Sequence, residues 1–140
     1  MKVLPIVVSA LVLAGCSTDP IPSRLATEAP PSQRIEFQHK PQGEYAILQV
    51  VRDSGHTGSL CSMGIYINGQ KAALLDPGQK VSFYLPPGAL IIGAGYSGSG
   101  MCGMGAARIE RDASVVRNST RTYRVSTSGD GVIDVSPTLQ

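Results

Sequence analysis

Short apolar runs separated by turn signals make up the chain from residue 44 onward. Residues 80–85 alternate apolar and polar side chains at a period of two, which is typical of a strand with one buried face. Asn68 and Gly69 lie between two apolar runs, and this dipeptide is a strong hairpin signal because both residues tolerate positive φ. Frequent Gly and Pro turns in a short chain favour many short strands over a few long helices.

This pattern predicts an all-β fold, a small antiparallel β-sandwich of about seven strands. The expected strands are residues 45–51, 60–67, 71–75, 80–85, 89–96, 107–111 with 114–116 as a continuation or a further strand, 122–127 and 132–135. The side chains expected in the core include Val81, Phe83, Leu85, Tyr123, Val125, Ile133 and Val135.

An export signal precedes this domain. Lys2 is followed by an apolar stretch at residues 3–13. This stretch is about 11 residues long, whereas a permanent membrane helix needs about 20. Leu13, Ala14, Gly15 and Cys16 come next. The alternative is a plain secretory signal, or the start of a transmembrane segment, in which the cysteine occurs by chance.

The motif Leu13-Ala14-Gly15-Cys16 resembles the lipobox of bacterial lipoproteins. The resemblance implies cleavage before Cys16, a diacylglycerol on its thiol and a further acyl chain, such as palmitate, on its amine. Two or three acyl chains anchor a protein stably. In that family an Asp after the cysteine tends to retain the protein in the inner membrane, and Ser17 stands at this position here. The resemblance therefore implies a lipid anchor in the outer membrane of the cell envelope, with the domain facing the periplasm.

The chain is thus expected to have three parts. Residues 1–15 are the signal peptide, residues 16–43 are the lipidated cysteine and a Pro-rich tether, and residues 44–137 are the β-sandwich domain. Residues 17–34 of the tether contain few apolar residues and four prolines, namely Pro20, Pro22, Pro30 and Pro31. Such a segment buries too little surface to fold, so we expect a disordered coil that holds the domain clear of the membrane.

One stretch of the domain resembles known modules. An Asn-Gly hairpin, a turn and an alternating strand are followed by Leu85-Pro86-Pro87-Gly88 and a further apolar strand. This order resembles the PEGA-type β-sandwich modules of bacterial surfaces, and it is similar to short uncharacterised envelope lipoproteins. The resemblance covers residues 45–135 and implies the sandwich, although the glycine- and methionine-rich residues 100–105 depart from it.

Two cysteines remain beside Cys16, and they are Cys61 and Cys102. An even pair in an exported protein predicts a disulfide, because the compartment is oxidising. The bond would pin the Gly-rich loop from Ser97 to Gly105 (residues 97–105) to the strand that carries Cys61. Closing the loop of about 42 residues between the two cysteines would stabilise the fold by about 4 kcal/mol in the chain-entropy model.

Soft metal ligands lie near these cysteines, namely His56, Met63, Met101 and Met104. They would suit copper(I) if the cysteines were reduced. Methionine is more often core filler, so we expect no metal and no cofactor. A nucleophile built from His56 and Cys61 is disfavoured, because a disulfide-bonded cysteine cannot attack a carbonyl. No Gly-x-Ser-x-Gly elbow is found, and we expect no enzyme.

The net charge of +2, without a run of like charges, argues against nucleic acid as a partner. Five arginines in the last third are expected to form a solvated face, and the alternative is a patch that meets an acidic partner or lipid head groups. These residues are Arg108, Arg111, Arg117, Arg121 and Arg124.

These observations favour a non-enzymatic binding or structural module of the envelope, for example within a secretion or conjugation apparatus, with no small-molecule substrate. Its expected partner is another envelope protein, reached through the Gly-rich loop and the turns of residues 53–59. Two alternatives stay open. One is a periplasmic inhibitor or immunity protein that blocks a hydrolase with the loop of residues 97–105, and the other is a copper-handling lipoprotein.

Overall fold

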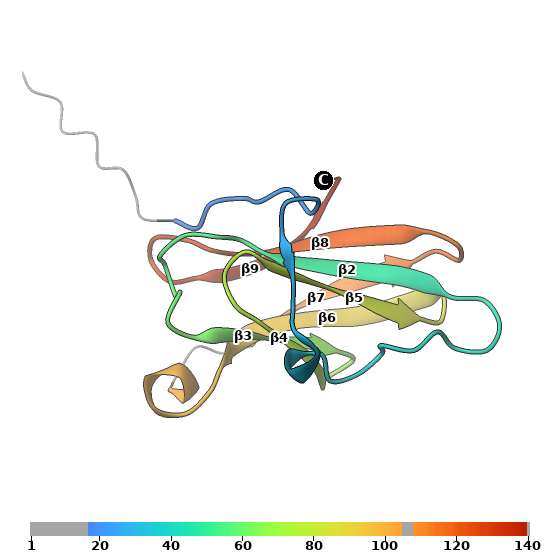
Figure 1. Ribbon diagram of the computed structural model, residues 1–140, viewed down its shortest axis with the longest axis horizontal. Coiled ribbons are helices and arrows are strands. Elements are labelled where there is room, and N and C mark those ends of the chain that lie inside the picture. The colour runs from blue at the N-terminus through green and yellow to red at the C-terminus, as the bar shows by residue number, and fades with distance from the viewer. Residues whose placement is uncertain (1–16, 105–107, 140) are drawn as a thin grey trace, which may run out of the picture.

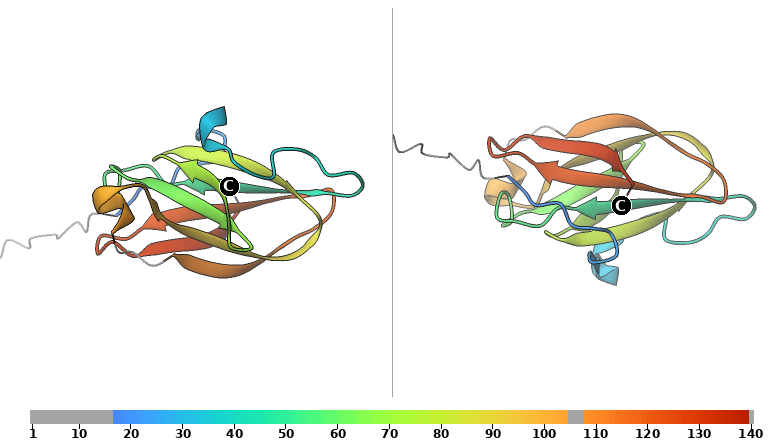
Figure 2. Two further views of the ribbon diagram at one scale, coloured as in Figure 1. Left: turned by 90° about the horizontal axis from the view of Figure 1, so that it is seen from below. Right: turned by 90° about the horizontal axis from the view of Figure 1, so that it is seen from above.

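Two β-sheets pack face to face in the computed structural model, which describes residues 17–104 and 108–139 (Figure 1). The five-stranded sheet has the order β1-β5-β2-β8-β9, and the four-stranded sheet has the order β4-β3-β6-β7. Views from above and below show the two layers enclosing one interior (Figure 2). The predicted all-β sandwich is therefore confirmed.

The described residues form nine strands and two short 3₁₀ turns. The strands are β1 (Thr27–Glu28), β2 (Ala46–Arg52), β3 (Ser62–Ile67), β4 (Gln70–Leu75), β5 (Gln79–Leu85), β6 (Gly88–Ser97), β7 (Ile109–Val115), β8 (Thr120–Thr127) and β9 (Ile133–Thr138). The turns are η1 (Pro31–Gln33) and η2 (Gly100–Gly103). Of the expected residues 107–111 and 114–116, residues 109–111 and 114–115 are parts of one strand, and Arg108 and Val116 lie outside it. Ala107 lies outside the described residues.

The core follows from the period-two pattern of the strands. On β5 the alternate residues Val81, Phe83 and Leu85 are buried, as predicted. The same holds for the predicted core residues of β8 and β9, which are Tyr123, Val125, Ile133 and Val135. All of them belong to one hydrophobic cluster that both sheets share.

The pairing of the strands is confirmed in part. Asn68 and Gly69 have φ angles of 48° and 81° and join β3 to β4 in the predicted hairpin. However, β2 and β8 are parallel, so the sandwich is not wholly antiparallel. After β7 the chain crosses to the five-stranded sheet, and the amide of Asn118 donates to the Tyr45 carbonyl at 2.9 Å. This contact starts β8 beside the beginning of β2, which makes the two strands run the same way.

The structure differs from the disordered tether predicted before residue 44. The Thr27 amide donates to the Gly78 carbonyl at 3.0 Å, and β1 extends the edge of β5. Farther along, the Ile35 amide donates to the Ala72 carbonyl at 2.9 Å, at the edge of β4. The segment therefore covers neighbouring edges of both sheets, and Ala29 is buried in the shared core. Unpaired strand edges offer free donors and acceptors, so a segment poor in apolar residues can still order there.

The two ends of the sandwich carry different sets of loops. The Thr18 end holds Thr18, the loop of residues 54–61, the loop of residues 98–104 and the β8–β9 turn, and the N-terminal chain joins the sandwich here (Figure 1). The opposite end holds the β3–β4 turn at residues 68–69, the β5–β6 turn at residues 86–87 and the β7–β8 crossing at residues 116–119.

Candidate functional site

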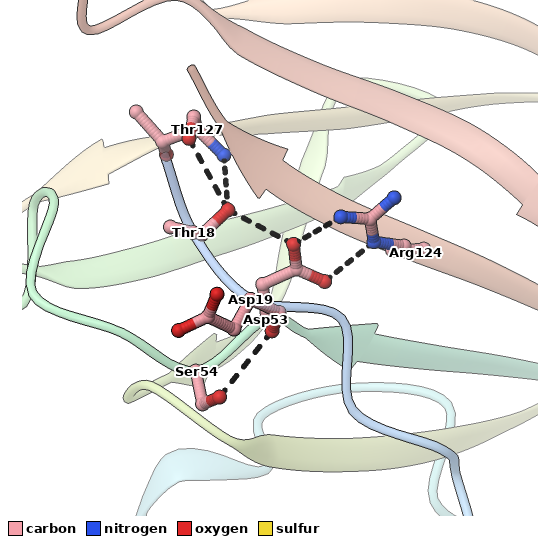
Figure 3. A network of polar contacts seen from close by, with 6 residues as sticks. All are labelled: Thr18, Asp19, Asp53, Ser54, Arg124 and Thr127. Atoms are coloured by element: carbon pink, nitrogen blue, oxygen red, sulfur yellow. Dashed lines mark hydrogen bonds and ion pairs between the residues drawn. The ribbon is translucent and has the colours of Figure 1, made fainter. Parts of the chain in front are cut away.

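The first described residues are bound at the Thr18 end through a polar network (Figure 3). Thr18 and Thr127 are joined twice, since each backbone amide donates to the other residue: Thr18 N to the Thr127 carbonyl at 3.0 Å, and Thr127 N to Thr18 Oγ1 at 2.9 Å. The Thr18 hydroxyl donates to Asp53 Oδ2 at 2.9 Å. Asp19 and Ser54 also exchange two backbone hydrogen bonds, of 2.9 and 3.0 Å. The chain is therefore held in place from Thr18 onward.

Asp53 is the centre of this network. Its carboxylate is 1% exposed and accepts hydrogen bonds from Arg124 Nε at 2.6 Å and from the Arg124 terminal nitrogen at 2.5 Å. Asp53 follows β2 directly, and the parallel register of β2 with β8 places Val51 opposite Arg124. Such two-point contacts are among the stronger ion pairs in proteins. The hydrogen bond with Asp53 raises the pKa of Arg124, so its guanidinium stays charged.

The buried side chain of Arg52 binds the backbone of the adjacent loop, residues 54–61. Its guanidinium donates to the carbonyls of Leu75 and Cys61, both at 2.7 Å, and to the carbonyl of Gly58 at 2.8 Å. The side chain is 3% exposed, and its burial lowers its pKa. One cation therefore ties the end of β2 to β4 and to the loop of residues 54–61.

The predicted disulfide between Cys61 and Cys102 is present, with an S–S distance of 2.03 Å and a Cα–Cα distance of 5.4 Å. It joins the loop that carries η2 to the residue before β3. Nearby, Tyr96 Oη and Thr127 Oγ1 lie 3.1 Å apart and connect the two sheets. The described part of the loop after β6 is thus exposed but crosslinked, while Gly105 lies outside the described residues.

The candidate copper ligands occupy different environments. Met63 is fully buried in the core, whereas Met101 and Met104 are 81% and 77% exposed. His56 is exposed in the loop of residues 54–61, and the sulfur of Cys61 is bonded to that of Cys102. No group of three or more His, Cys, Asp or Glu within the described residues could hold a metal ion.

Four of the five arginines predicted to share a solvated face are paired with carboxylates. Arg108 pairs with Glu110 at 2.8 Å, and Arg108 also lies 4.5 Å from the centre of the Tyr66 ring. The other three pairs are Arg111 with Asp134, Arg117 with Glu44, and Arg124 with Asp53. These pairs spread over both ends of the sandwich, so they do not make one basic patch.

Exposed apolar side chains also gather at the Thr18 end. Leu60 is 90% exposed and Val132 is 55% exposed, beside the exposed Met101 and Met104 of the crosslinked loop. Sequence reasoning placed Leu60 in a strand and Val132 in another, and it missed this set. An apolar run bounded by turns does not reveal which of its terminal residues stay outside the sheet.

The lipid-acceptor cysteine predicted at position 16 lies outside the described residues, two positions before Thr18. Among residues 17–104 and 108–139 no helix has the length and apolarity needed to cross a membrane. Comparison of the chain with protein families, with curated proteins and with solved structures finds no match.

Proposed function

We propose that the chain is a lipoprotein of the cell envelope, anchored through Cys16 in the outer membrane and facing the periplasm. Its domain acts as a non-enzymatic binding or structural module for another envelope protein, within an assembly such as a secretion or conjugation apparatus. The observation that carries the proposal is the fixed position of Thr18, which Asp53 and Thr127 hold by direct hydrogen bonds.

Because Thr18 is bound to the domain, only a short connection separates the proposed anchor from the sandwich. Cys16 precedes Thr18 by two residues, and two residues of extended chain span about 7 Å. A flexible tether would let the domain search a wide volume, but this connection keeps it at the lipid surface. A short, fixed connection suits a module that supports or positions an assembly at the membrane.

The buried charged groups of the site also favour a structural role. Both oxygens of the Asp53 carboxylate accept hydrogen bonds from Arg124 or Thr18. The guanidinium of Arg52 donates to three backbone carbonyls. These groups already serve to join strands and loops, so they are poorly suited to bind or activate a substrate.

The inhibitor alternative has one observation in its favour. An inhibitory loop must be exposed and rigid, and the described part of the loop after β6 is exposed and crosslinked by Cys102. Its place at the Thr18 end opposes this alternative, because lipids anchored at Cys16 would occupy the space that a hydrolase needs.

Lipidation is tested by replacing Cys16 in the full chain. We expect the wild type and a Ser17→Ala control to incorporate labelled palmitate and to fractionate with outer membranes in a Gram-negative host. Cys16→Ser should lose the label and leave the membrane fraction. If Cys16→Ser is processed, labelled and retained like the wild type, the lipoprotein proposal is wrong.

The partner is tested by photo-crosslinking in living cells from single positions. An anchor at Cys16 would place the Gly-rich loop and residues 53–59 against the membrane, so the partner is proposed at the opposite end and not at these loops, where the sequence placed it. A crosslinker at Val116, which is 66% exposed at the opposite end, should give a discrete adduct with an envelope protein. A crosslinker at Met101 distinguishes the inhibitor alternative, which requires an adduct with a hydrolase from that loop. If no position away from the Thr18 end gives a protein adduct, the binding-module proposal fails.

A further inference from the structure

We propose that the Thr18 end is itself a membrane-binding surface, whose apolar side chains enter the lipid head-group layer beside the anchor. The surface consists of Leu60, Met101, Met104 and Val132, and its ligand is the phospholipid bilayer. This inference rests on the proposed lipid anchor at Cys16 and adds a second, non-covalent contact to it.

The four side chains are unusually exposed for their type. Their exposed fractions are 90% for Leu60, 81% for Met101, 77% for Met104 and 55% for Val132. Leucine, methionine and valine are among the residues most often buried in proteins. Apolar side chains gathered on one surface mark sites for another protein or for a membrane.

A disulfide keeps two of these residues close, and the β8–β9 turn brings Val132 to the same end of the molecule. The disulfide joins Cys61, next to Leu60, to Cys102, next to Met101. Val132 lies in the β8–β9 turn and borders an open hollow of about 300 Å³ together with Ser17. In Figure 1 the η2 loop, the β8–β9 turn and the entry of the N-terminal chain lie at the same end of the molecule.

The position of the proposed anchor favours lipid as the partner of this surface. About 7 Å of chain separates the Thr18 position from Cys16, whose acyl chains must enter the bilayer. The Thr18 end therefore lies in or against the head groups, which leaves little space for a protein partner between them. Apolar side chains commonly penetrate about 5–10 Å into this boundary.

The charges of this end indicate that the contact is apolar rather than electrostatic. Asp130 is exposed at the tip of the β8–β9 turn, and its hydrogen bond with Ser128 lowers its pKa. Two arginines near this end are already paired, Arg124 with Asp53 and Arg108 with Glu110. A surface that has an exposed carboxylate and paired cations is not attracted to anionic lipids. Added salt should therefore not release this surface from the membrane.

A second contact would fix how the domain stands on the membrane. An anchor alone allows the domain to pivot about Cys16. Contact through the whole Thr18 end would instead keep the long axis of the sandwich pointing away from the membrane surface (Figure 1). The turns of the opposite end, including Val116, would then project into the periplasm, where the proposed partner is reached.

Tryptophan reporters in the mature lipoprotein test the surface, because the chain has no tryptophan of its own. Leu60→Trp and Met101→Trp replace exposed side chains at the Thr18 end, and Val116→Trp is the matched control at the opposite end. Each protein, purified from membranes, is reconstituted into vesicles of phosphatidylethanolamine and phosphatidylglycerol that contain a brominated phospholipid. Co-flotation with the vesicles is measured together with tryptophan emission.

We expect all three proteins to float with the vesicles. Emission of Leu60→Trp and Met101→Trp should shift to the blue and be quenched by the bromine at low and high salt, whereas Val116→Trp emission should be unchanged. Flotation without quenching at the Thr18 end would overturn this inference while leaving the anchor intact. Failure of the lipidated proteins to float would overturn the proposed anchor and this inference with it.

Discussion

The guanidinium of Arg124 binds the carboxylate of Asp53 at two points, with nitrogen–oxygen distances of 2.6 and 2.5 Å. The Asp53 side chain is 1% exposed and the Arg124 side chain is 31% exposed. The contact joins the neighbouring parallel strands β2 and β8 at the end where Thr18 enters. Since Thr18 also donates to Asp53, the ion pair and the entry of the chain form one unit.

Loss of Arg124 should destabilise the domain strongly. Arg124→Met would leave a buried carboxylate without its cation, and we expect the free energy of unfolding to fall by about 3 kcal/mol. Urea unfolding followed by circular dichroism measures this change. Arg117→Met is the control, because Arg117 and Glu44 are 65% and 61% exposed, and it should change stability by less than about 0.5 kcal/mol. Equal losses in both variants would contradict a special role for the buried pair.

Thr18 should control the order of the N-terminal segment. Thr18→Ala removes a hydroxyl that Asp53 and the Thr127 amide both use, and leaving such buried groups unpaired costs about 1–3 kcal/mol. Thr18→Ser keeps the hydroxyl and should behave like the wild type. Hydrogen exchange at residues 18–19 and 127 measures the effect. Unchanged protection in Thr18→Ala would show that other contacts hold this segment.

Much of the fold could be predicted from local patterns in the sequence. Val81, Phe83 and Leu85 face the core because period-two alternation carries that information directly. The hairpin at Asn68 and Gly69 follows from the backbone conformations that these two residues allow. The Cys61–Cys102 bond was predicted from the expected export signal and an even number of remaining cysteines.

The candidate site depends on contacts that local patterns do not contain. Asp53 and Arg124 are 71 residues apart and meet only because β8 lies parallel to β2. Composition predicted a disordered tether, but that segment orders on sheet edges whose free hydrogen-bonding groups arise only after folding. The exposure of Leu60 likewise depends on where β3 begins, one residue after the disulfide.

The disulfide should stabilise the Thr18 end in particular. The double variant Cys61→Ser/Cys102→Ser should unfold about 2–4 kcal/mol more easily, since the chain-entropy model gives an upper value near 4 kcal/mol. Limited proteolysis should cut the variant within residues 98–104 before it cuts elsewhere. Cys16→Ser is the control and should leave the stability of the domain unchanged. Equal proteolysis of the oxidised and double-variant loops would contradict this role.

Asp76 should make stability depend on pH. Ser62 Oγ donates to its carboxylate at 2.6 Å and Gln33 Nε2 at 2.9 Å, and these bonds lower the pKa of Asp76 below its ordinary value of 3.8. A carboxylate with a lowered pKa in the folded state stabilises above its unfolded pKa, and this contribution is lost as the pH falls through the folded pKa. The wild type should therefore lose more stability than Asp76→Asn between about pH 5 and pH 2.

A second variant checks the cause of this pH dependence. Ser62→Ala removes the largest contribution to the lowered pKa of Asp76, so its stability should fall less steeply with acid than that of the wild type. Urea unfolding at a series of pH values gives the slopes for all three proteins. If Ser62→Ala keeps the full slope of the wild type, another carboxylate is responsible.

A side chain at Gly58 should destabilise the fold because it would clash with the ring of Tyr96. A Cβ at Gly58 would lie 2.0 Å from Tyr96 Oη, and the φ of +69° adds backbone strain. Gly69 has a similar φ of +81° but nothing within 4 Å. Gly69→Ala therefore measures the backbone strain alone, of about 1 kcal/mol, and Gly58→Ala should cost clearly more because Tyr96 must move and lose its contact with Thr127.

Tyr96→Ala separates the steric clash from the backbone strain. With the ring removed, Gly58→Ala should cost no more than Gly69→Ala costs in the wild type, because only the positive φ remains unfavourable. The four proteins of this double-mutant cycle are compared by urea unfolding, and the coupling between Gly58 and Tyr96 is the quantity of interest. If Gly58→Ala is equally costly with and without the ring, then Arg52, which binds the Gly58 carbonyl at 2.8 Å, governs the backbone at this position instead.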